Sequence, residues 1–354
     1  MEKFVDLQPL LLPEAHQRFA IEEITAVAHV RRAAMNLAAW GNFNETDAGK
    51  VGIVVTELAT NIVKHAGRGE LLLRLSHRTS ARSCIEIIAL DSGPGISDLA
   101  ACMRDGMSTT GTAGAGLGAM RRLADEFEAY SSVGQGSAFY LSLWSGAPPS
   151  PFSVPASPLQ FGAVSLPLAG EESCGDAWYC ELRGDTALIA VADGLGHGPD
   201  AAIAARAALS VCADPIFSAP ARLLDLAHQR ARPTRGAAVA FATAHLKAGS
   251  VHYSGIGNIA GSVCDEQSRR HLISHNGIVG HTTRKAREMA VEWNPEAAII
   301  LHSDGISTQW ALAAYPGLLQ CHPALIAAVI YRDFTRQTDD ATVLVIKRAA
   351  PKHA

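Results

Sequence analysis

Two separated stretches in the first third of the chain carry residues able to bind a phosphorylated ligand. One is the glycine-dense segment from Asp91 to Gly118, which directly follows the apolar run IEIIAL. The other is VGIVVTELATNIVKHA, in which Glu57 and Asn61 stand four residues apart among apolar neighbours. Glycines let the backbone come close to a ligand, so that backbone N–H groups can face phosphate oxygens. The first stretch predicts a phosphate-binding loop, and the second predicts a helix with a polar edge facing a pocket.

The glycine-dense segment does not fit two common phosphate-binding motifs. Neither Gly93-x-Gly95 nor Gly114-x-Gly116 has a glycine three residues further on, which excludes the dinucleotide-binding fingerprint. No Gly-Lys-Ser/Thr with P-loop spacing occurs anywhere in the chain. The segment must therefore belong to another kind of site.

Aspartates in the second half of the chain form another candidate cluster. They stand in Gly175-Asp176, Asp193-Gly194, Asp304-Gly305 and Asp339-Asp340, each just before or just after a strongly apolar run. One such dipeptide alone is more often a turn than a ligand. Four of them at the ends of expected strands indicate a functional cluster.

The elements that must position the first set of residues alternate between helix and strand periodicity. A strand is expected at 19–24 and a helix at 25–40, with a second helix capped by Thr46 or Asp47 and reaching about His65. Strands at LLLRLS and CIEIIAL would then deliver Asp91 at a strand end. The stretch LGAMRRLADEF predicts a helix after the glycines, and AYSSVGQGSAFYLSLW predicts a turn and a final strand.

The second half reads as strands in runs with helices inserted between them. Strands are expected at FGAVSLPL, WYCELR, TALIAVAD, AVAFATAHL, HYSGIG, GSVCD, AAIILHSDG and ATVLVIKR. Helices are expected at 199–212, 219–230, 309–314 and 322–331. This order predicts an α+β fold built as layered sandwiches. The five prolines within residues 146–158 predict a linker between a domain at 1–145 and a domain at 159–354.

The composition of the chain limits which kinds of partner and which cellular compartment are expected. The 354 residues carry a net charge of −4, with no basic excess in either half, so nucleic acid is not expected as a direct partner. Seven cysteines without metal-finger spacing predict reduced thiols. No apolar stretch reaches the ~18 residues of a membrane span and no signal-peptide layout is present, so the expectation is a cytoplasmic protein without membrane contact.

The first domain resembles the GHKL ATP-binding fold of histidine kinases, gyrase-type ATPases and anti-sigma serine kinases. The resemblance covers about residues 20–145 and lies in ELATNIVKHA as the N box, DSGPGI as the first glycine box and GTAGAGLGAMRRL as the second. It is greatest for the RsbT branch of switch kinases, although Ser137 replaces the more usual threonine of the last box. The resemblance implies a two-layer sandwich that binds ATP with Mg²⁺.

By the same resemblance, Glu57 would orient or deprotonate the attacking hydroxyl, Asn61 would bind Mg²⁺ and Asp91 would accept from the adenine amino group. Glycines of the second box would form a lid over the phosphates. The expected nucleotide-binding set is Asn61, Lys64, Asp91, Gly93, Gly95, Ser108, Thr109, Gly111, Gly114, Gly116, Leu117, Gly118 and Ser137.

The second domain resembles the PPM metal-dependent phosphatases in their SpoIIE and RsbX branch. The motifs CGDAW, VADGLGHG, GIGN, LHSDGIS and TDDATVLVI occur in order across about residues 160–348. The resemblance implies an α/β/β/α sandwich with two Mn²⁺ or Mg²⁺ ions, bridged by Asp193 as the central catalytic ligand. Its expected metal set is Asp176, Asp193, the carbonyl of Gly194, Asp304 and Asp339, with Asp340 as the alternative at the last position.

Histidines near these motifs are expected to have structural rather than catalytic roles. His197 could act as a general acid, but a local hydrogen bond at a helix entry is the favoured interpretation. The same structural role is expected for His275, His281 and His302. Gly255, Gly257 and Asn258 are expected to shape the loop beside the metals.

Together the resemblances imply a bifunctional protein serine/threonine kinase and phosphatase in a bacterial stress-signalling partner switch. Its expected partners are STAS-domain antagonist or stressosome-type proteins. Two alternatives stay open: a phosphatase whose GHKL domain only binds ATP or a partner, and a kinase whose phosphatase half is a scaffold. The protein substrate, the preferred metal, the oligomeric state and any coupling between the domains are not determined by the sequence.

Overall fold

The computed structural model describes residues 12–79, 82–103, 116–146, 157–214, 218–282 and 286–349. The chain divides into two compact units. Unit 2 combines His16–Ser157 with the later segment Tyr315–Arg332, and unit 1 holds the remainder. The linker and the domain boundaries expected at 145 and 159 stay predictions.

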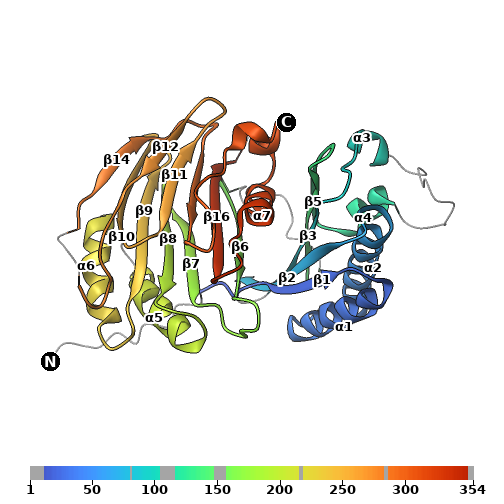
Figure 1. Ribbon diagram of the computed structural model, residues 1–354, viewed down its shortest axis with the longest axis horizontal. Helices are drawn as coiled ribbons and strands as arrows, with labels where there is room; N and C mark the ends of the chain where they lie inside the picture. Colours follow the sequence, from blue (N-terminus) through green and yellow to red (C-terminus); the bar gives the residue numbers. More distant parts are fainter. Residues whose placement is uncertain are drawn as a thin grey trace. The chain divides into compact units, whose positions relative to one another are not determined.

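Unit 2 is built on a five-stranded antiparallel sheet in the order β1-β2-β3-β5-β4. Its strands are β1 (Gln17–Ile21), β2 (Gly69–Thr79), β3 (Arg82–Asp91), β4 (Glu126–Ser132) and β5 (Gly136–Trp144). Helices α1 (Ile24–Trp40) and α2 (Glu45–Asn61) lie against one face of this sheet (Figure 1). The core lies between that face and the helices, where Val30, Leu58 and Ile87 are fully or almost fully buried. This arrangement carries the polar edge of α2 to the C-terminal end of β3.

The helix α1 follows its sequence pattern, because the apolar positions Val27, Val30, Ala34 and Leu37 are all buried. The start of α2 differs from the prediction. Asn44, and neither Thr46 nor Asp47, is the N-cap, and its side chain accepts a hydrogen bond from the Asp47 backbone N–H. An Asn at this position satisfies one of the free N–H groups of the first turn.

The end of the second helix also departs from regular α geometry. After Asn61 the chain continues as a π-helix, Ile62–Ala66, and ends at Gly67 with φ 78°. π-helical turns are rare and are found most often at functional sites. Here the turn carries Lys64 and His65, the candidate residues one turn beyond Asn61.

The segment after the glycine-dense block forms less helix than its amphipathic pattern predicts. Helix α4 covers only Leu117–Leu123, and residues 126–132 form strand β4. The prediction of a helix through LADEF was therefore wrong, whereas the turn and the final strand predicted within AYSSVGQGSAFYLSLW are present as residues 133–135 and β5. Pairing of β4 with β5 outweighs the local helix preference, since a hairpin joined by residues 133–135 satisfies the backbone of both strands.

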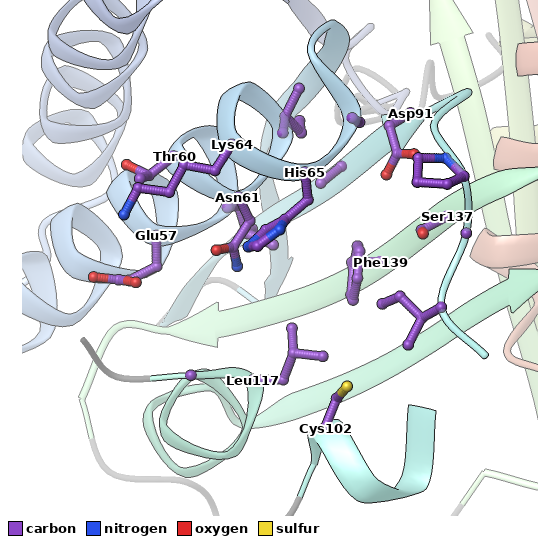
Figure 2. A pocket seen from close by; sticks show the side chains of 18 of the residues that line it. Glu57, Thr60, Asn61, Lys64, His65, Asp91, Cys102, Leu117, Ser137 and Phe139 are labelled. Atoms are coloured by element: carbon purple, nitrogen blue, oxygen red, sulfur yellow. The ribbon is translucent and has the colours of Figure 1, made fainter. Parts of the chain in front are cut away.

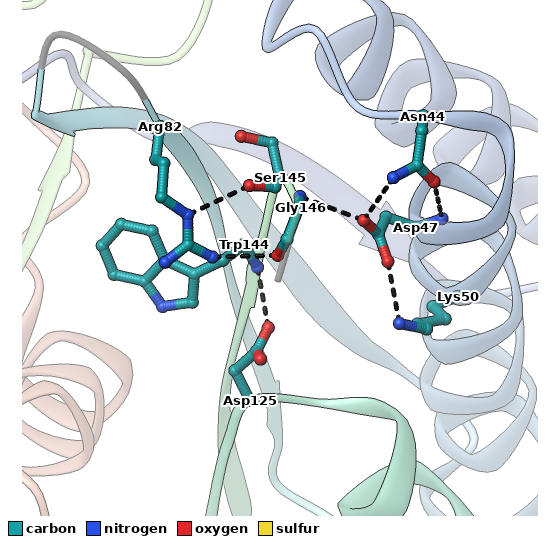
Figure 3. A network of polar contacts seen from close by, with 8 residues as sticks. All are labelled: Asn44, Asp47, Lys50, Arg82, Asp125, Trp144, Ser145 and Gly146. Carbon is teal, nitrogen blue, oxygen red and sulfur yellow. Dashed lines mark hydrogen bonds and ion pairs between the residues drawn. The ribbon is translucent and has the colours of Figure 1, made fainter. Parts of the chain in front are cut away.

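The exit of β5 is tied to the start of α2 by a polar network (Figure 3). The Gly146 backbone N–H donates to Asp47 at 3.0 Å, and Asp47 also accepts from Asn44 and Lys50. On the other side Arg82 donates to the carbonyls of Ser145 and Gly146 at 3.1 and 2.9 Å. These contacts fix the point at which the chain leaves the sheet.

Unit 1 contains two β-sheets. One has the order β13-β10-β9-β8-β7 with β14 paired to β10, and the other has the order β12-β11-β15-β16-β6. The strands of the first sheet are β7 (Asp176–Arg183), β8 (Thr186–Gly194), β9 (Ala237–His245), β10 (Ser250–Ile256), β13 (Ser274–His275) and β14 (Met289–Glu292). Those of the second are β6 (Leu159–Leu166), β11 (Ala260–Cys264), β12 (Arg269–Leu272), β15 (Ala298–His302) and β16 (Ala341–Arg348).

Two hydrophobic cores hold unit 1 together. One is shared by the two sheets and includes Val191, Tyr253 and Leu344. The other packs helices α5 (Pro199–Leu209) and α6 (Pro220–Ala231) on the β7–β10 sheet and includes Ala205, Leu224 and Phe241. Figure 1 shows these helices beside strands β7 to β10. The layered α+β fold predicted from the sequence is confirmed.

Several elements of the second half differ from the prediction. The helix expected at 309–314 is a short 3₁₀ turn, Leu312–Ala314, and the helix expected to reach residue 212 ends at Leu209 before a 3₁₀ turn, Ser210–Ala213. The short strands β12, β13 and β14 were not predicted, because four or fewer residues show no clear period. The helix expected at 322–331 is α7, Pro323–Phe334, and is preceded by a 3₁₀ turn, Leu318–Gln320.

Among the described residues, no helix is both long enough and apolar enough to span a bilayer.

Candidate functional sites

The first candidate site is a pocket of about 390 Å³ in unit 2. Glu57, Thr60 and Asn61 reach it from α2, and Asp91 and Ser137 reach it from strands β3 and β5 (Figure 2). Lys64 and His65 come from the π-helical turn, and Leu117 comes from the start of α4. The pocket thus joins parts of the N box, the first glycine box and the end of the second glycine box. This is the convergence that three motifs in one nucleotide site require.

Asp91 is the anchor of one end of the pocket. It is 9% exposed, and its Oδ1 accepts from the Gly93 backbone N–H at 2.8 Å. Burial raises the pKa of this carboxyl, and hydrogen bonds from Gly93 and Ser137 partly oppose the rise. A buried carboxyl with one oxygen held by the backbone can present its other oxygen to a ligand donor such as an exocyclic amine.

Close packing requires a glycine at position 95, in the first glycine box. Gly95 has φ +73°, and a Cβ at this position would lie 2.2 Å from the carbonyl oxygen of Ser132. Any other L-residue would therefore be strained and would displace the adjacent hairpin. The glycine brings the backbone loop against the end of β4 and leaves the pocket open.

Some of the remaining predicted residues of this site line the pocket, and others do not. Gly116 lines the pocket and is the N-cap residue of α4, whereas Gly93 and Gly118 lie outside its lining. Ser108, Thr109, Gly111 and Gly114 fall outside the described residues, so their roles stay predictions. The sequence prediction omitted Thr60, Ile96, Cys102 and Phe139, which also line the pocket. Thr60 and Ile96 lie inside the N box and the first glycine box, whereas Cys102 and Phe139 lie outside every motif and are brought to the pocket by packing.

The second candidate site lies in unit 1, at a pocket of about 460 Å³. Asp193, Asp304 and Asp339 line it together with Asn258 and Asn276. Asp193 is the last residue but one of β8 and faces Asp176 of β7 in the register of the sheet. Asp304 follows β15, and Asp339 precedes β16, the neighbouring strand. Antiparallel pairing therefore brings aspartates that are distant in sequence to one region.

Asp176 and Asp340 lie buried near that pocket rather than in its lining. Asp176 is 7% exposed, and its Oδ2 accepts from the Ser303 hydroxyl at 2.6 Å. Asp340 is 3% exposed, and its Oδ1 accepts from the Leu168 backbone N–H at 2.8 Å. The second oxygen of each, Oδ1 of Asp176 and Oδ2 of Asp340, is buried without a hydrogen-bond partner.

The carboxylates of unit 1 raise one another's pKa values. Burial, reinforced by the charges of Asp176 and Asp304, raises the pKa of Asp193 to about 9. Burial raises the pKa of Asp176 to about 7, with a further contribution from Asp340. So many acidic groups cannot all be ionised side by side unless positive charge balances them. A divalent cation would supply that charge and reverse the shifts.

The donor chemistry fits hard divalent cations, although the carboxylates are not drawn into a tight shell. Within the part of the chain that the structure describes, no three His, Cys, Asp or Glu side chains are gathered closely enough to enclose an ion as they stand. Two buried carboxylate oxygens have no hydrogen-bond partner and neighbouring carboxylates raise the pKa of Asp193, and a cation would relieve both because it attracts the like charges that repel one another. The residues present therefore suit Mg²⁺ or Mn²⁺, which prefer oxygen ligands.

Glycine is again required next to an aspartate. A Cβ on Gly194 would lie 2.0 Å from the carbonyl oxygen of Ala201 in helix α5. The glycine therefore lets the end of β8 approach the first turn of α5 closely. Asp193, the residue before it, lines the pocket, whereas Gly194, an expected metal ligand, lies outside its lining.

The histidines have local partners. His197 Nδ1 lies 2.6 Å from Glu171 Oε1, and the buried His302 accepts from the Trp310 indole N–H at 3.2 Å. His281 contacts the Thr234 carbonyl at 3.2 Å. Asn258 donates to Asp304 at 2.6 Å, so the loop after β10 supports an aspartate of the site directly.

Comparison with known proteins assigns the two parts of the chain to two families. Residues 22–142 match the histidine kinase-like ATPase domain, and residues 183–349 match the family described as stage II sporulation protein E, SpoIIE. The serine/threonine-protein kinase RsbT of Bacillus subtilis (strain 168) is 35% identical over 119 residues, which are 33% of this chain and 88% of RsbT.

A solved structure from the bacterial stressosome, described as a modular system adapted to control secondary messenger signaling, is also similar. It shares 25% sequence identity with a TM-score of 0.51, over 54% of this chain and all of that one. The match to the histidine kinase-like ATPase domain includes Glu57, Asn61 and Asp91, which line one pocket, and the SpoIIE match spans four of the five aspartates. The chain accordingly belongs to the RsbT family of GHKL serine/threonine kinases and carries, in the same chain, a SpoIIE-type PPM phosphatase domain.

Proposed function

We propose that this protein is a bifunctional switch enzyme that phosphorylates and dephosphorylates serine or threonine residues of STAS-type antagonist proteins. The observation that carries the proposal is the presence of two candidate sites in one chain. Glu57, Asn61 and Asp91 surround the unit 2 pocket, and the aspartates around Asp193 form the unit 1 site. The family matches support opposite phosphoryl chemistries for the two sites.

In the proposed kinase site, each residue acts on a different part of the reaction. Asp91 accepts a hydrogen bond from adenine, and Asn61 offers its side-chain oxygen to the Mg²⁺ that accompanies ATP. Glu57, one helical turn before Asn61, orients or deprotonates the attacking hydroxyl. Lys64, on the π-helical turn, places a positive charge near the phosphates. If water replaced the protein hydroxyl, the same arrangement would support ATP hydrolysis.

In the proposed phosphatase site, Asp176, Asp193, Asp304 and Asp339 would hold two Mn²⁺ or Mg²⁺ ions, and the Gly194 carbonyl would be a further ligand. When bound, two such metal ions activate water and stabilise the charge of a phosphoryl group. The chain's own contribution is to hold the ligands on adjacent strand ends and to fix Asp304 through Asn258. Asp340 has one oxygen held by the Leu168 N–H, and its other oxygen keeps it as the alternative to Asp339.

The choice of partner rests on the relatives. RsbT is a serine/threonine-protein kinase, and the similar solved structure comes from the bacterial stressosome. We extend these two properties to this chain as a role in a stress-signalling partner switch within the cytoplasm. Its substrate would then be a serine or threonine on an antagonist protein of the STAS class.

Phosphoryl transfer from γ-labelled ATP to a purified STAS-domain protein in Mg²⁺ tests the kinase half. The wild-type chain should label the substrate, whereas Glu57→Gln should bind nucleotide but transfer at least ~100-fold more slowly, because general-base catalysis contributes about that much. Glu22→Gln, which changes an exposed residue outside the pocket, is the matched control. Nucleotide binding without any transfer by the wild type would leave the domain as a regulatory module.

Hydrolysis of p-nitrophenyl phosphate and of a phosphoserine protein tests the phosphatase half. We expect activity that requires Mn²⁺ or Mg²⁺ and is lost in Asp193→Ala. Asp225→Asn, an exposed position on α6, should retain the wild-type rate. Activity that persists in Asp193→Ala, or that survives EDTA in the wild type, would refute the metal assignment.

A further inference from the structure

The segment Tyr315–Arg332 lies between the phosphatase motifs in sequence but belongs to the compact unit of the nucleotide pocket. It comes after Asp304 and before Asp339, yet its spatial neighbours place it in unit 2 with His16–Ser157. It contains the 3₁₀ turn Leu318–Gln320 and all but the last two residues of α7. Unit 2 is therefore completed by a piece of chain from the phosphatase half.

The segment lies on the sheet face opposite α1 and α2. The His322 ring stacks on Tyr140 of β5, with ring centroids 4.3 Å apart, and the His322 backbone N–H donates to Glu128 of β4 at 3.0 Å. Tyr331 interacts with Arg18 of β1 and Glu70 of β2. These strand residues alternate with those that pack on α1 and α2, such as Phe139, Leu141 and Phe127, so they belong to the other face.

The last residue of the segment contacts the floor of the nucleotide pocket. Arg332 Nη1 donates to the backbone carbonyl of Asp91 at 3.0 Å and approaches the carbonyl of Ser137 at 3.5 Å. Asp91 and Ser137 are directly paired in the β3–β5 ladder. The Arg332 charge also opposes the rise in the pKa of Asp91 that burial causes. Arg332 thus holds the backbone of Asp91 in place and favours its ionised form, and Asp91 is the residue expected to accept a hydrogen bond from adenine.

The residues that follow Arg332 are fixed beside the proposed metal ligands. Within unit 1, Phe334 accepts from the Ser307 N–H at 2.8 Å, and the Arg336 N–H donates to the Gly305 carbonyl at 2.8 Å. Thr335 forms a β-bridge with Ile306. Gly305 directly follows Asp304, and Asp339 and Asp340 lie three and four residues after Arg336. One continuous stretch of chain therefore runs from the nucleotide floor to two of the proposed metal-ligand loops.

We propose that Arg332 is a positioning residue for the nucleotide pocket and that, through α7, nucleotide binding and phosphatase metal binding influence each other. Nucleotide that fixes Asp91 and Ser137 would favour the α7 position in which Arg332 reaches their carbonyls. That position in turn fixes the segment 334–340 and the loops carrying Asp304, Asp339 and Asp340. Because such coupling is reciprocal, occupancy of the metal site should alter nucleotide affinity by the same factor. The inference rests on the proposed function of both sites, but it does not require phosphoryl transfer to a protein.

The first measurement is the affinity for a fluorescent ATP analogue at constant Mg²⁺ and Mn²⁺. Arg332→Ala should weaken binding about fivefold or more, and Arg332→Lys should restore part of the loss because lysine keeps a charged donor. Arg270→Ala removes an arginine from the surface of unit 1 and should bind as the wild type does. Equal affinity of wild type and Arg332→Ala would overturn the positioning role.

The second measurement separates coupling from a local effect. Nucleotide affinity is compared in wild type, Arg332→Ala, Asp193→Ala and the double variant. Coupling predicts that Asp193→Ala changes nucleotide affinity severalfold in the wild-type background and much less when Arg332 is already absent. Identical factors in both backgrounds would show that the two positions act independently and would refute the linkage.

The third measurement tests the effect of nucleotide binding on the phosphatase site. A non-hydrolysable ATP analogue should change the rate of p-nitrophenyl phosphate hydrolysis by wild type about fivefold or more, a typical size for coupling between two sites. It should have little effect on Arg332→Ala. The same change in both proteins would contradict the proposal. These assays give their result even if the wild type never phosphorylates a protein, so failure of the kinase role and failure of the coupling are distinguishable.

Circular dichroism and thermal unfolding show whether each variant is folded. If Arg332→Ala does not fold, Arg332→Lys and His322→Ala decide the matter. His322→Ala removes the contact with Tyr140 without touching Asp91, so it should reduce the effect of nucleotide on hydrolysis while largely preserving nucleotide affinity. An unchanged effect of nucleotide on hydrolysis in both variants would overturn the proposal.

Discussion

Asp91 combines two properties that oppose each other in the free protein. Its carboxyl is buried, which disfavours the ionised form and raises its pKa. Its proposed role as an acceptor for adenine requires at least one free oxygen. Binding sites often retain such groups at a cost to stability, because the ligand later supplies the missing partner.

Replacing Asp91 by asparagine should therefore separate binding from stability. The side-chain amide would turn a donor toward the adenine amino group, so we expect nucleotide affinity to fall tenfold or more, in line with ~1.5–3 kcal/mol for a hydrogen bond to a charged group. The same change removes a buried carboxylate and should raise the melting temperature at neutral pH. Isothermal titration with ADP and thermal unfolding measure the two effects. A variant that loses both affinity and stability would contradict this account.

The pH dependence follows from the direction of the pKa shift. Because the folded state holds the proton of Asp91 more tightly than the unfolded chain, stability falls as the pH rises above the ordinary value of 3.8. The contribution is fully present below that value and is lost as the pH passes the raised pKa of the folded state. Asp91→Asn should accordingly gain stability over the wild type as the pH increases from acid toward neutrality. A difference that shrinks with rising pH would refute the assignment.

Asp193 should show a comparable conflict that a metal ion relieves. In EDTA near neutral pH, Asp193→Asn should melt at a higher temperature than the wild type. The raised pKa of Asp193 means that folding must take up a proton, a cost that asparagine avoids. Added Mn²⁺ should stabilise the wild type by ~2.7 kcal/mol at one hundred times its dissociation constant and should have much less effect on the variant. Differential scanning calorimetry with and without Mn²⁺ checks this. Equal stabilisation of both proteins would argue against Asp193 as a ligand.

At the scale of elements, the start of α2 depends on the Asn44 cap. Asn44→Ala removes the acceptor for the Asp47 N–H and should reduce stability by ~1 kcal/mol. Loss of the cap also weakens the network that joins Asp47 to Gly146. Chemical denaturation gives the free energy, and Asn44→Asp, which keeps an acceptor, should restore most of it. No loss in the alanine variant would mean that Asp47 and Lys50 hold the helix start without the cap.

The pairing of β2 with β3 contains a buried ion pair between Arg74 and Glu86, which are directly opposite in register. Both side chains are almost completely buried. Removing only the acid, as in Glu86→Ala, should cost ~3–5 kcal/mol because the Arg74 guanidinium stays buried and loses this carboxylate. The double replacement Arg74→Met with Glu86→Leu should be much milder. A double-mutant cycle by denaturant unfolding checks this, and simple addition of the two single effects would contradict it.

At the scale of the whole molecule, unit 2 is made from two separated parts of the chain. A chain that ends at Ser157 would lack Tyr315–Arg332, and Tyr140, Glu128, Arg18 and Glu70 would lose the partners that this segment provides. Such a chain should melt at a lower temperature than unit 2 does in the full protein and should bind a hydrophobic dye. Adding residues 315–332 as a peptide should partly reverse both effects. Equal stability without the segment would show that the sheet face does not need it.

How far the sequence predicted the fold depended on the length of each pattern. Helix α1 and strand β3 were foreseen because long, regular periodicity leaves little choice. The first residues of β4 were predicted to be helical, since they become a strand only through pairing with β5. The cap at Asn44 was missed by two or three residues, where several polar residues compete for the same role.

The candidate sites followed the same rule. Glu57, Asn61, Asp91 and Asp193 could be chosen from the sequence because motif order restricts their chemistry. Cys102 and Phe139 could not, because they lie outside the motifs and only packing brings them to the pocket. Arg332 was also missed, since no local pattern relates it to a residue 241 positions away.

The sequence by itself determined the two chemistries of this protein, because glycine boxes and strand-end aspartates restrict which ligands the backbone and carboxylates can hold. It also determined the layered α+β architecture through the alternation of helix and strand patterns. Only the tertiary structure decided which residues share a pocket, which aspartates are buried, and that a helix from the phosphatase half completes the nucleotide unit. These features depend on contacts between residues far apart in the chain, and a sequence pattern records only what lies within one element.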